Sequence, residues 1–310
     1  MKQFNYKDIK GLSKLNKNQQ FFIKNFLKLA NELYEKSDKT LMELLKKQDL
    51  NTEELLKNIA TIMLKYQVKD DKMNLTLIQQ KQLTAKLDKT VTNIFSDEYK
   101  EENKLITKQL KDQVKDKYNI NNYLVSLGMD FTLEKISKRD LEKILKHTIK
   151  GENYSNRIWT NKNDLSKKVK HEIRKFLRGE TNLNKIEKEI RKKFKVNKMC
   201  TTRLVRNEVV RVQNAANEQF FKDNNDFKNL LYSATLDSKT CEKCASDDGK
   251  VFKVDEDRPE LPRHVNDRCT YILIPNKDYT PNNRIDNMNK KNISYKDYKE
   301  WYQEKRIRQR

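Results

Sequence analysis

Helix-breaking residues are almost absent from the first 258 residues of the chain. All four prolines, Pro259, Pro262, Pro275 and Pro281, lie after residue 258, and the chain of 310 residues contains only five glycines. Proline removes a backbone donor and clashes inside a helix, and glycine loses conformational entropy there. The sequence therefore predicts that the first 258 residues are mainly helical, and it argues against a compact all-β fold.

The charge balance is consistent with long helices. Charged residues make up 36% of the chain and hydrophobic residues 35%, which is typical of helices with narrow apolar stripes and wide solvated faces. The formal net charge is +22, from 67 Lys and Arg against 45 Asp and Glu. Such a charge favours association with nucleic acid or with an acidic protein surface. The alternative is that the lysines mainly keep a helical protein in solution.

The N-terminus and the cysteine content bear on the compartment. The segment MKQFNYKDIKGLSKLNKNQQ has no apolar core of the signal-peptide kind, and no stretch approaches the roughly 18 uninterrupted apolar residues of a membrane helix. We therefore expect a cytoplasmic protein that binds no membrane. Four cysteines are too few for a disulfide framework in a chain of this length, and three of them lie near a histidine, which favours metal binding.

Apolar residues recur at helical spacing through residues 18–160. The spacing predicts amphipathic helices that pack on one another, with stripes such as Leu55, Ile59, Met63 and Tyr66. Asn51 and Glu54 have capping-box spacing, which predicts a helix start at Asn51. A coiled-coil surface for a partner is the alternative, but sustained heptads are not evident.

A pair of helices is predicted after a loop at residues 151–163. Gly179 ends the first helix and a Thr181/Asn182 cap begins the second. Their apolar stripes are Leu165, Val169, Ile173 and Phe176, and then Leu183, Ile186, Ile190 and Phe194. The short connection predicts an antiparallel hairpin. A longer, separate helix is predicted over residues 199–222.

The helix pair carries an excess of positive charge. Residues 162–195 contain thirteen Lys and Arg but only five Asp and Glu. We predict that the polar faces of this pair contact DNA phosphates, although plain solvated faces would carry the same charges. The candidate contact residues are Lys167, Lys168, Lys170, Arg174, Lys175, Arg191, Lys192 and Lys193.

The apolar period changes near residue 229. Residues 229–236 predict a strand, Asp248-Gly249 predicts a hairpin turn before residues 251–252, and residues 271–274 predict a closing strand. The fold class is therefore mainly α with a small C-terminal α+β module. A helical N-terminal region, a helix hairpin and a long helix precede a short antiparallel sheet.

The last residues are polar and basic. Residues 276–310 predict a tail with one short helix at about residues 294–303. Three aromatic side chains of that helix are expected to dock on the body of the protein: Tyr295, Tyr298 and Trp301.

Three cysteines and one histidine follow the predicted strand. Cys241 and Cys244 form a Cys-x-x-Cys pair, and nineteen residues separate Cys244 from His264. Four residues separate His264 from Cys269. Two close pairs joined by a hairpin can supply the four ligands of a tetrahedral Zn²⁺. We predict a structural zinc site at these four residues; a redox dithiol and a metal-free set of thiols are the alternatives.

The pattern gives little support to catalysis. Three thiolates and one imidazole leave no open position for a substrate water. The His-x-Glu sequence of a zinc deaminase, His-Glu-x-x-His and a Gly-rich phosphate loop are all missing. A zinc-stapled endonuclease of the His-Asn-His kind is the best enzymatic alternative, but it needs a second histidine and this region offers only His264. We therefore predict that the protein is not an enzyme.

The order of these features resembles a known family. The features are Trp159 before a helix pair, Arg-Leu-Val-Arg-Asn-Glu at residues 203–208, Asn214, Asp237-Ser-Lys-Thr-Cys-Glu-Lys-Cys, Asp248-Gly249-Lys250, His264 and Arg268-Cys269. The segment from Trp159 to Pro275 is by these residues similar to phage head-morphogenesis or minor capsid proteins, the group related to protein F of phage Mu.

The resemblance also singles out residues of unknown role and two departures. The family positions of unknown role are Arg206, Glu208, Asn214, Asp237 and Gly249. The family usually has threonine where this chain has Asn207, and it commonly has a further cysteine where Asp267 stands. Asp267 is therefore either an oxygen ligand or a spectator.

The resemblance implies a minor head protein that acts in head morphogenesis. Its implied partners are the portal protein, capsid and scaffold proteins, and double-stranded DNA bound without sequence preference. Its implied location is the interior of the virion head, and the host bacterial cytoplasm during assembly. A cytoplasmic zinc-containing DNA-binding protein unrelated to virions is the alternative.

The helical pattern, the cysteine/histidine cluster and the resemblance together predict an organisation in three parts. Residues 1–150 are a helical region for contact with the portal or another partner, and residues 151–275 are the minor head protein domain. The zinc-binding hairpin of that domain lies at residues 237–270. Residues 276–310 are the basic tail.

Overall fold

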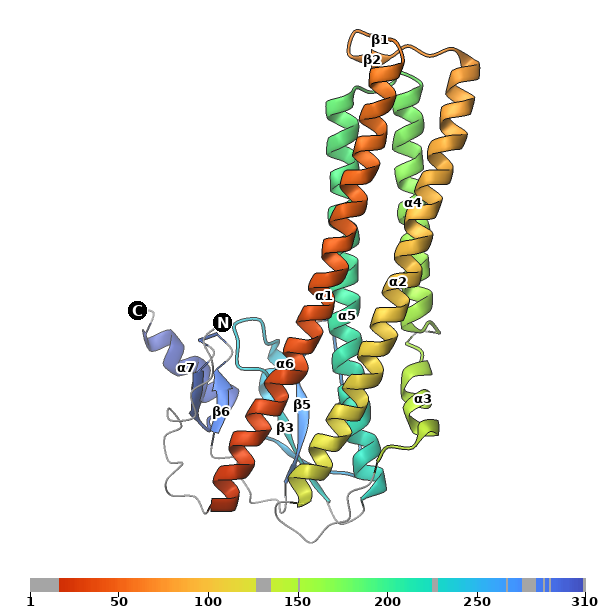
Figure 1. The fold of residues 1–310 in the computed structure, drawn as a ribbon. Helices are drawn as coiled ribbons and strands as arrows, with labels where there is room; N and C mark the ends of the chain where they lie inside the picture. The colour runs from red at the N-terminus through yellow and green to blue at the C-terminus, as the bar shows by residue number, and fades with distance from the viewer. Residues whose placement is uncertain are drawn as a thin grey trace. The chain divides into compact units, whose positions relative to one another are not determined.

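The computed structural model of the chain describes residues 17–126, 135–149, 151–224, 228–265, 267–274, 283–286, 288–289 and 291–308. These residues are mainly helical with small antiparallel sheets, which confirms the coarse fold class (Figure 1). The helices are α1 (Lys17–Lys65), α2 (Leu77–Ser126), α3 (Lys138–Lys146), α4 (Tyr154–Leu177), α5 (Leu183–Asp223), α6 (Glu242–Asp247) and α7 (Tyr298–Arg308). The strands are β1 (Val68–Lys69), β2 (Lys72–Met73), β3 (Asn229–Ser233), β4 (Val251–Lys253), β5 (Thr270–Ile274), β6 (Asn283–Asp286) and β7 (Lys291–Ser294). Within these ranges, every helix is too short or too polar to cross a membrane.

The chain divides into two compact units, and each unit is assembled from separate stretches of sequence. The helical unit consists of Glu35–Leu110 and Lys146–Glu208. The mixed unit consists of Met1–Tyr34, Lys111–Leu145 and Val209–Arg310, and it contains the three-stranded sheet. Helices α1, α2 and α5 contribute residues to both units.

Helices α1, α2, α4 and α5 run side by side in the helical unit (Figure 1). Apolar side chains from all four helices form its core. Leu55 and Ile59 of α1 and Val169 of α4 lie in this core, as their helical spacing predicted. The rings of Phe95 on α2 and Phe194 on α5 stack with their centroids 5.5 Å apart. Burial of each such side chain contributes about 1.5–3 kcal/mol, so helix-on-helix packing accounts for the amphipathic pattern of this unit.

The connection between α4 and α5 contains the predicted glycine at the end of α4 and the predicted cap at the start of α5. Gly179 follows α4 with φ +72°, and its N–H donates to the carbonyl of Phe176 while Glu180 N–H donates to the carbonyl of Lys175. This is the Schellman pattern, which needs a left-handed residue and favours glycine. A Cβ at Gly179 would lie 2.7 Å from the carbonyl oxygen of Met73. The Asn182 side chain accepts from Lys185 N–H at 3.0 Å and caps α5.

Two predicted helix boundaries in this unit are wrong. The predicted loop at residues 151–163 is mostly helix, because α4 begins at Tyr154, where the Asn153 side chain accepts from Asn156 N–H at 2.9 Å. The predicted break between residues 194 and 199 does not exist, because α5 runs from Leu183 to Asp223. Val196 and Met199 are exposed in the structure, so the apolar stripe shifts there and looks like a gap in the sequence.

A buried charged layer crosses the core of the helical unit. It consists of Glu98 and Glu102 on α2 and Lys162 on α4, each at most 3% exposed. The Lys162 ammonium donates to Glu98 Oε2 and to Asn197 Oδ1, both at 2.9 Å, and also to Glu102. Two carboxylates therefore share one lysine where water is nearly excluded, an arrangement that is tolerated only when its hydrogen bonds are satisfied.

Two amides of α1 complete the charged layer. Asn51 donates to Glu98 at 2.8 Å and Gln48 donates to Glu102 at 2.6 Å. Asn51 lies inside α1, so the predicted helix start at this residue is wrong. Its side chain hydrogen-bonds to another helix and is not available to cap its own.

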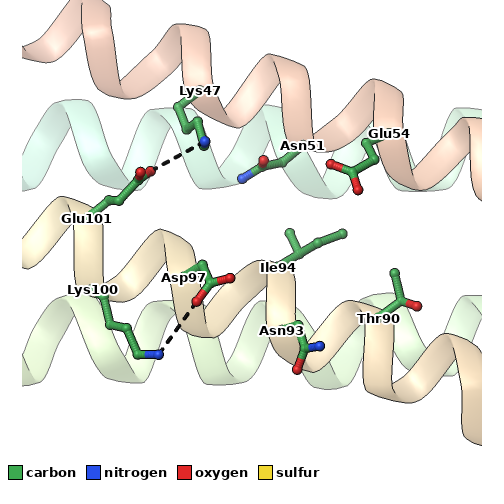
Figure 2. A pocket seen from close by; sticks show the side chains of 9 residues that line it. All are labelled: Lys47, Asn51, Glu54, Thr90, Asn93, Ile94, Asp97, Lys100 and Glu101. Carbon is green, nitrogen blue, oxygen red and sulfur yellow. Dashed lines mark ion pairs between the residues drawn. The ribbon is translucent and has the colours of Figure 1, made fainter.

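A cleft of about 520 Å³ lies between α1 and α2 beside this layer (Figure 2). Exposed ion pairs at the cleft join Lys47 to Glu101 at 3.8 Å and Lys100 to Asp97 at 3.6 Å. Such pairs contribute ~0–1 kcal/mol. Among the lining residues only Asn51 is buried, and its amide already donates a hydrogen bond to Glu98. The cleft gives no indication of a bound ligand.

The three-stranded sheet of the mixed unit has the order β4-β3-β5, with both pairings antiparallel. Leu230 of β3 lies opposite Phe252 of β4 and Leu273 of β5. Tyr232 and Tyr271 bury one face of this sheet together with Phe220 of α5. The three strands confirm the predicted small sheet, although β3 ends at Ser233 rather than at residue 236. The turn at Asp248-Gly249 is not the predicted hairpin turn, because it follows α6 rather than a strand, and β4 and β5 each pair with β3 rather than with each other.

The C-terminal tail contains more structure than its polar sequence predicted. Strands β6 and β7 form an antiparallel hairpin that the sequence analysis missed. Helix α7 begins at Tyr298, later than predicted, and Tyr298 and Trp301 are 8% and 2% exposed. They pack with Leu236, which confirms the predicted docking of these two aromatic residues.

Candidate metal centre

Helix α6 presents the first two cysteines. Cys241 is the N-cap of α6, and its sulfur accepts from the backbone N–H of Cys244 at 3.4 Å. Cys244 sits in the first turn with its side chain buried. The Cys-x-x-Cys spacing therefore turns both sulfurs toward the same side of the helix start.

A short loop presents His264 and Cys269. The carboxylate of Asp267, which is 2% exposed, accepts from the backbone N–H of Arg263 at 2.8 Å and from that of Cys269 at 2.9 Å. The backbone N–H of Asp267 in turn donates to the carbonyl of His264 at 3.1 Å. Asp267 therefore holds both ends of the loop together.

The structure brings the predicted ligands together in two overlapping groups. The ligand atoms of Cys241, Cys244 and His264 lie within 4.8 Å of one another, and so do those of Cys244, Asp267 and Cys269. His264 Nε2 lies 3.4 Å from the Cys241 sulfur and 3.5 Å from the Cys244 sulfur. Tetrahedral Zn²⁺ at its usual bond lengths to sulfur and nitrogen gives a sulfur-to-nitrogen separation of about 3.5 Å. The first three residues therefore fit one metal ion.

The orientation of the imidazole favours metal binding through Nε2. His264 Nδ1 lies 3.0 Å from the carbonyl oxygen of Val265, a distance at which Nδ1–H donates to that oxygen. This hydrogen bond fixes the tautomer and leaves the Nε2 lone pair toward the sulfurs. The bond to Val265 is also the main reason that the pKa of His264 is raised above its ordinary value.

The thiols differ in how readily they ionise. Burial opposes ionisation of Cys241, but the N–H of Cys244 and the imidazole of His264 outweigh it and lower the pKa of the Cys241 thiol. Burial raises the pKa of Cys244 and that of Cys269. Two thiols that resist ionisation in the absence of a cation are consistent with sites that a metal ion would deprotonate.

The fourth ligand is the least defined by the geometry. Cys269 lies near Cys244 and Asp267 but in a different group from His264. Both oxygens of Asp267 accept backbone N–H groups of the loop, which favours a loop-forming role over metal binding. Cys269 therefore stays the predicted fourth ligand.

A tyrosine and an arginine that the sequence analysis did not select lie against the sulfurs. The hydroxyl of Tyr232 is buried and has no hydrogen-bond partner among the described nitrogen and oxygen atoms. Burial raises its pKa, and the thiols of Cys244 and Cys269 raise it further. A metal-bound thiolate would be an acceptor for this orphaned O–H, so the residues present fit a metal better than a metal-free cluster.

Arg263 connects the loop that carries His264 and Cys269 to α6 through its own hydrogen bonds, which do not depend on a metal ion. Its guanidinium bonds to Asp247 at 2.5 Å and to the carbonyl of Lys243 at 3.0 Å. It also lies 5.2 Å from the centre of the Tyr232 ring. The only sequence signal for this residue was its place next to His264.

The C-terminal hairpin and α7 are clamped to this module through one ion pair. Asp248, whose side chain is fully buried, accepts from Arg284 at 2.6 and 3.0 Å. Asp248 also accepts from the backbone N–H of Ala234 at 2.7 Å and from that of Tyr298 at 2.6 Å. One carboxylate thus ties β3, β6 and α7 to the turn that follows α6.

Replacing Arg284 with Met is expected to destabilise the mixed unit by about 2–3 kcal/mol, because a buried carboxylate loses its cation but keeps two backbone donors. Urea unfolding of the full chain carrying Trp159→Phe, so that buried Trp301 is its single tryptophan, measures this by fluorescence. Lys291→Met, at an exposed position on the same hairpin, is the matched control and should change the free energy of unfolding by less than about 0.5 kcal/mol. Equal effects of the two substitutions would contradict the clamp.

The predicted DNA-contact residues divide into two sets. Some are engaged within the protein: Arg174 with Asp88, Lys170 with Thr92, Arg191 with Glu53 and Glu187, and Lys193 with Glu189. Lys167, Lys168 and Lys192 are exposed, and the described residues offer them no ion-pair or hydrogen-bond partner, whereas half-buried Lys175 lies close enough to Glu180 to help lower the pKa of that carboxyl. Only these three exposed lysines are fully available to an outside phosphate.

Several family-motif positions have structural roles. Asn214 of α5 lies 3.4 Å from the Cys269 carbonyl, to which its amide donates, and it accepts from Thr270. Asn214 therefore fixes the start of β5 beside the candidate ligand Cys269. Asp237 pairs with Arg268, and its carbonyl accepts from the Tyr298 hydroxyl.

The remaining family-motif positions, Glu208, Arg206 and Gly249, differ in burial and in backbone conformation. Glu208 is fully buried and accepts from Arg157 at 2.9 Å, whereas Arg206 is exposed. Gly249 has φ +80°, and a Cβ there would lie 3.3 Å from the Tyr295 hydroxyl. Gly249 is therefore required by the turn that precedes β4.

Comparison with known proteins finds one family model that matches the part of the chain containing the candidate ligands. The family model described as Phage Mu protein F like protein matches residues 167–272. The match covers about a third of the chain and confirms the resemblance drawn from the motifs, which supports a protein related to the phage head. It includes α5, β3, β4, the first part of β5 and all four candidate ligands. No curated protein and no solved structure matches the chain.

Proposed function

We propose that the protein is a phage minor head protein that acts in head morphogenesis and is associated with the portal. The observation that carries this proposal is that the family match at residues 167–272 encloses the whole Cys/His cluster. The proposed organisation is a partner-binding helical region at residues 1–150, the minor head protein domain at 151–275 and a C-terminal segment at 276–310.

Zn²⁺ is the proposed metal, and its role is structural. It is held by Cys241, Cys244, His264 and Cys269, and when bound it ties the start of α6 to the loop that ends at β5. Three thiolates and one imidazole complete its usual coordination number. Elemental analysis of the purified chain is expected to give one zinc per chain, and a chain that folds without any metal would overturn this part of the proposal.

Portal association is tested with the proteins of one phage. The chain is expected to co-sediment with procapsids that contain the portal, and not with capsid shells assembled without it. Equal recovery with both shells would favour a general capsid contact. Absence from both would overturn the virion assignment and leave the cytoplasmic zinc-containing DNA-binding protein.

The non-enzymatic role is tested against the endonuclease alternative. The protein is incubated with supercoiled plasmid and Mg²⁺, and the expected result is intact plasmid. Nicking that disappears in His264→Ala but persists in His171→Ala, which alters a histidine on α4, would show that the cluster is catalytic.

DNA binding is expected to be electrostatic and independent of sequence. The affinity of the chain for duplex DNA should fall steeply between about 50 and 200 mM salt, because bound lysines and arginines release counterions from the phosphates. Fluorescence anisotropy with two duplexes of unrelated sequence measures this. A flat salt dependence would remove DNA from the proposed partners.

A further inference from the structure

One face of α5 carries a straight row of unpaired positive charge. Lys188, Lys192, Lys195, Arg203 and Arg206 are spaced by four, three, eight and three residues, and all five are exposed. At 3.6 residues per turn these positions fall on one side of the helix. We call these five residues the α5 basic face. They all lie in the helical unit.

The α5 basic face is free of carboxylates. The acidic residues of α5 near it are engaged, because Glu187 pairs with Arg191 and Glu189 pairs with Lys193. In the described part of the chain, the structure joins none of the five cations to a carboxylate. Their charge is therefore available to a partner outside the protein.

A row of lysines on α2 provides a comparison. Lys104, Lys108 and Lys111 are also exposed and also fall on one side of a helix. Asp97 lies seven residues before Lys104 and Asp112 lies four residues after Lys108, so both carboxylates share that side. The α2 row is a mixed surface, whereas the α5 basic face has one sign of charge.

The dimensions of the α5 basic face suit a nucleic acid backbone. Lys188 and Arg206 are eighteen residue steps apart, which corresponds to about 27 Å at a rise of 1.5 Å per residue. This is about eight base pairs of B-DNA at 3.4 Å per step. A rigid helix holds the five cations at fixed spacing along this length, and phosphate contacts need only charge and position.

The composition of the α5 basic face argues against a protein partner. Protein interfaces usually contain aromatic or apolar anchors at their centre. In the row from Lys188 to Arg206 the only apolar side chain is Met199, with exposed Val196 at its edge. The surface is therefore narrow, cationic and poor in apolar anchors.

We propose that the α5 basic face binds the phosphate backbone of duplex DNA. This inference rests on the proposed DNA contact and moves its centre from the ion-paired residues of α4 and α5 to this face. It assigns a role to Arg206, the exposed residue of the family motif. Glu208, two positions later, is buried and pairs with Arg157 inside the helical unit.

The test compares two variants with equal loss of charge. In the first, all five residues of the α5 basic face are changed to Gln, which keeps a similar helix propensity. In the control, five exposed lysines of α2 are changed to Gln: Lys89, Lys104, Lys108, Lys111 and Lys115. Circular dichroism and the thermal midpoint establish that both variants fold. The probe is a fluorescein-labelled 30-base-pair duplex, titrated by anisotropy at several salt concentrations.

The first variant is expected to bind the duplex about a hundredfold or more weakly near 150 mM salt, with a logarithmic salt slope less steep by about four. The control is expected to keep most of the wild-type slope. Equal losses in the two variants would overturn the proposal in favour of dispersed charge. Unchanged binding by the first variant, with loss of its binding to polyglutamate, would overturn it in favour of an acidic protein partner. If the wild-type chain binds no DNA at all, the DNA contact of the proposed function fails together with this inference, whereas the virion assignment is tested separately with portal-containing procapsids.

Discussion

Removal of the metal is expected to abolish the folded structure around α6. Helix α6 has only six residues, too few for a helix that is stable on its own, and a structural zinc contributes about 10–16 kcal/mol to the folding of comparable peptides. Cys244→Ser should therefore lose the bound zinc and the cooperative unfolding transition of the mixed unit. Near-UV circular dichroism and metal analysis of the full chain measure both effects, and a strong chelator should reproduce them in the wild type.

Cys200 provides a matched control for this substitution. It lies on α5, is partly buried and belongs to neither group of candidate ligands. Cys200→Ser should keep one zinc per chain and the wild-type transition. If Cys244→Ser and Cys200→Ser behave alike, the cluster does not hold a structural metal.

Replacing Lys162 with Met is expected to destabilise the helical unit by about 3–5 kcal/mol at neutral pH, because it leaves two buried carboxylates without their cation. The side chains of Glu98, Glu102 and Lys162 are at most 4% exposed, so water does not replace the lost ammonium. Urea unfolding followed by far-UV circular dichroism measures the change. Lys167→Met, at an exposed position on the same helix, should cost less than about 0.5 kcal/mol.

The loss of stability caused by Lys162→Met is expected to depend on pH. Burial raises the pKa of Glu102 above its ordinary value of 4.5. Between that value and the native pKa, the folded state binds more protons than the unfolded state, so stability falls as pH rises. Loss of the Lys162 ammonium raises the pKa of Glu102 further. The cost of Lys162→Met should therefore be smaller at pH 5 than at pH 8, and an equal cost at both would contradict a charged layer.

The proximity of the candidate ligands was predictable because they come from two short segments. A cysteine that caps α6 and another three residues later must face the same side, whatever the rest of the chain does. The pair formed by His264 and Cys269 is likewise closed by one local side chain, Asp267. Local spacing is readable in a sequence when local hydrogen bonds decide the geometry. The residues that support the cluster from a distance, Tyr232 and Arg284, had no such spacing.

The errors in the helical region have a common cause. The start predicted at Asn51, the loop predicted before residue 163 and the break predicted near residue 197 all fall beside the buried charged layer. There the core contains polar side chains such as Lys162 and Asn197 where the apolar stripe should continue. When helix ends are predicted from the spacing of apolar residues, a buried polar layer of this kind is mistaken for the end of a helix.

The mainly helical class, the α4–α5 turn at Gly179, the small sheet and the grouping of the candidate metal ligands can be predicted from the amino-acid sequence, because they depend on contacts between near neighbours in the chain. Which polar residues are buried depends instead on the packing of segments that are far apart in the sequence. Glu98 meets Lys162 across 64 positions, and Asp248 meets Arg284 across 36. A charged side chain looks the same in a sequence whether water or a buried partner solvates it, and only the packing of distant segments distinguishes the two.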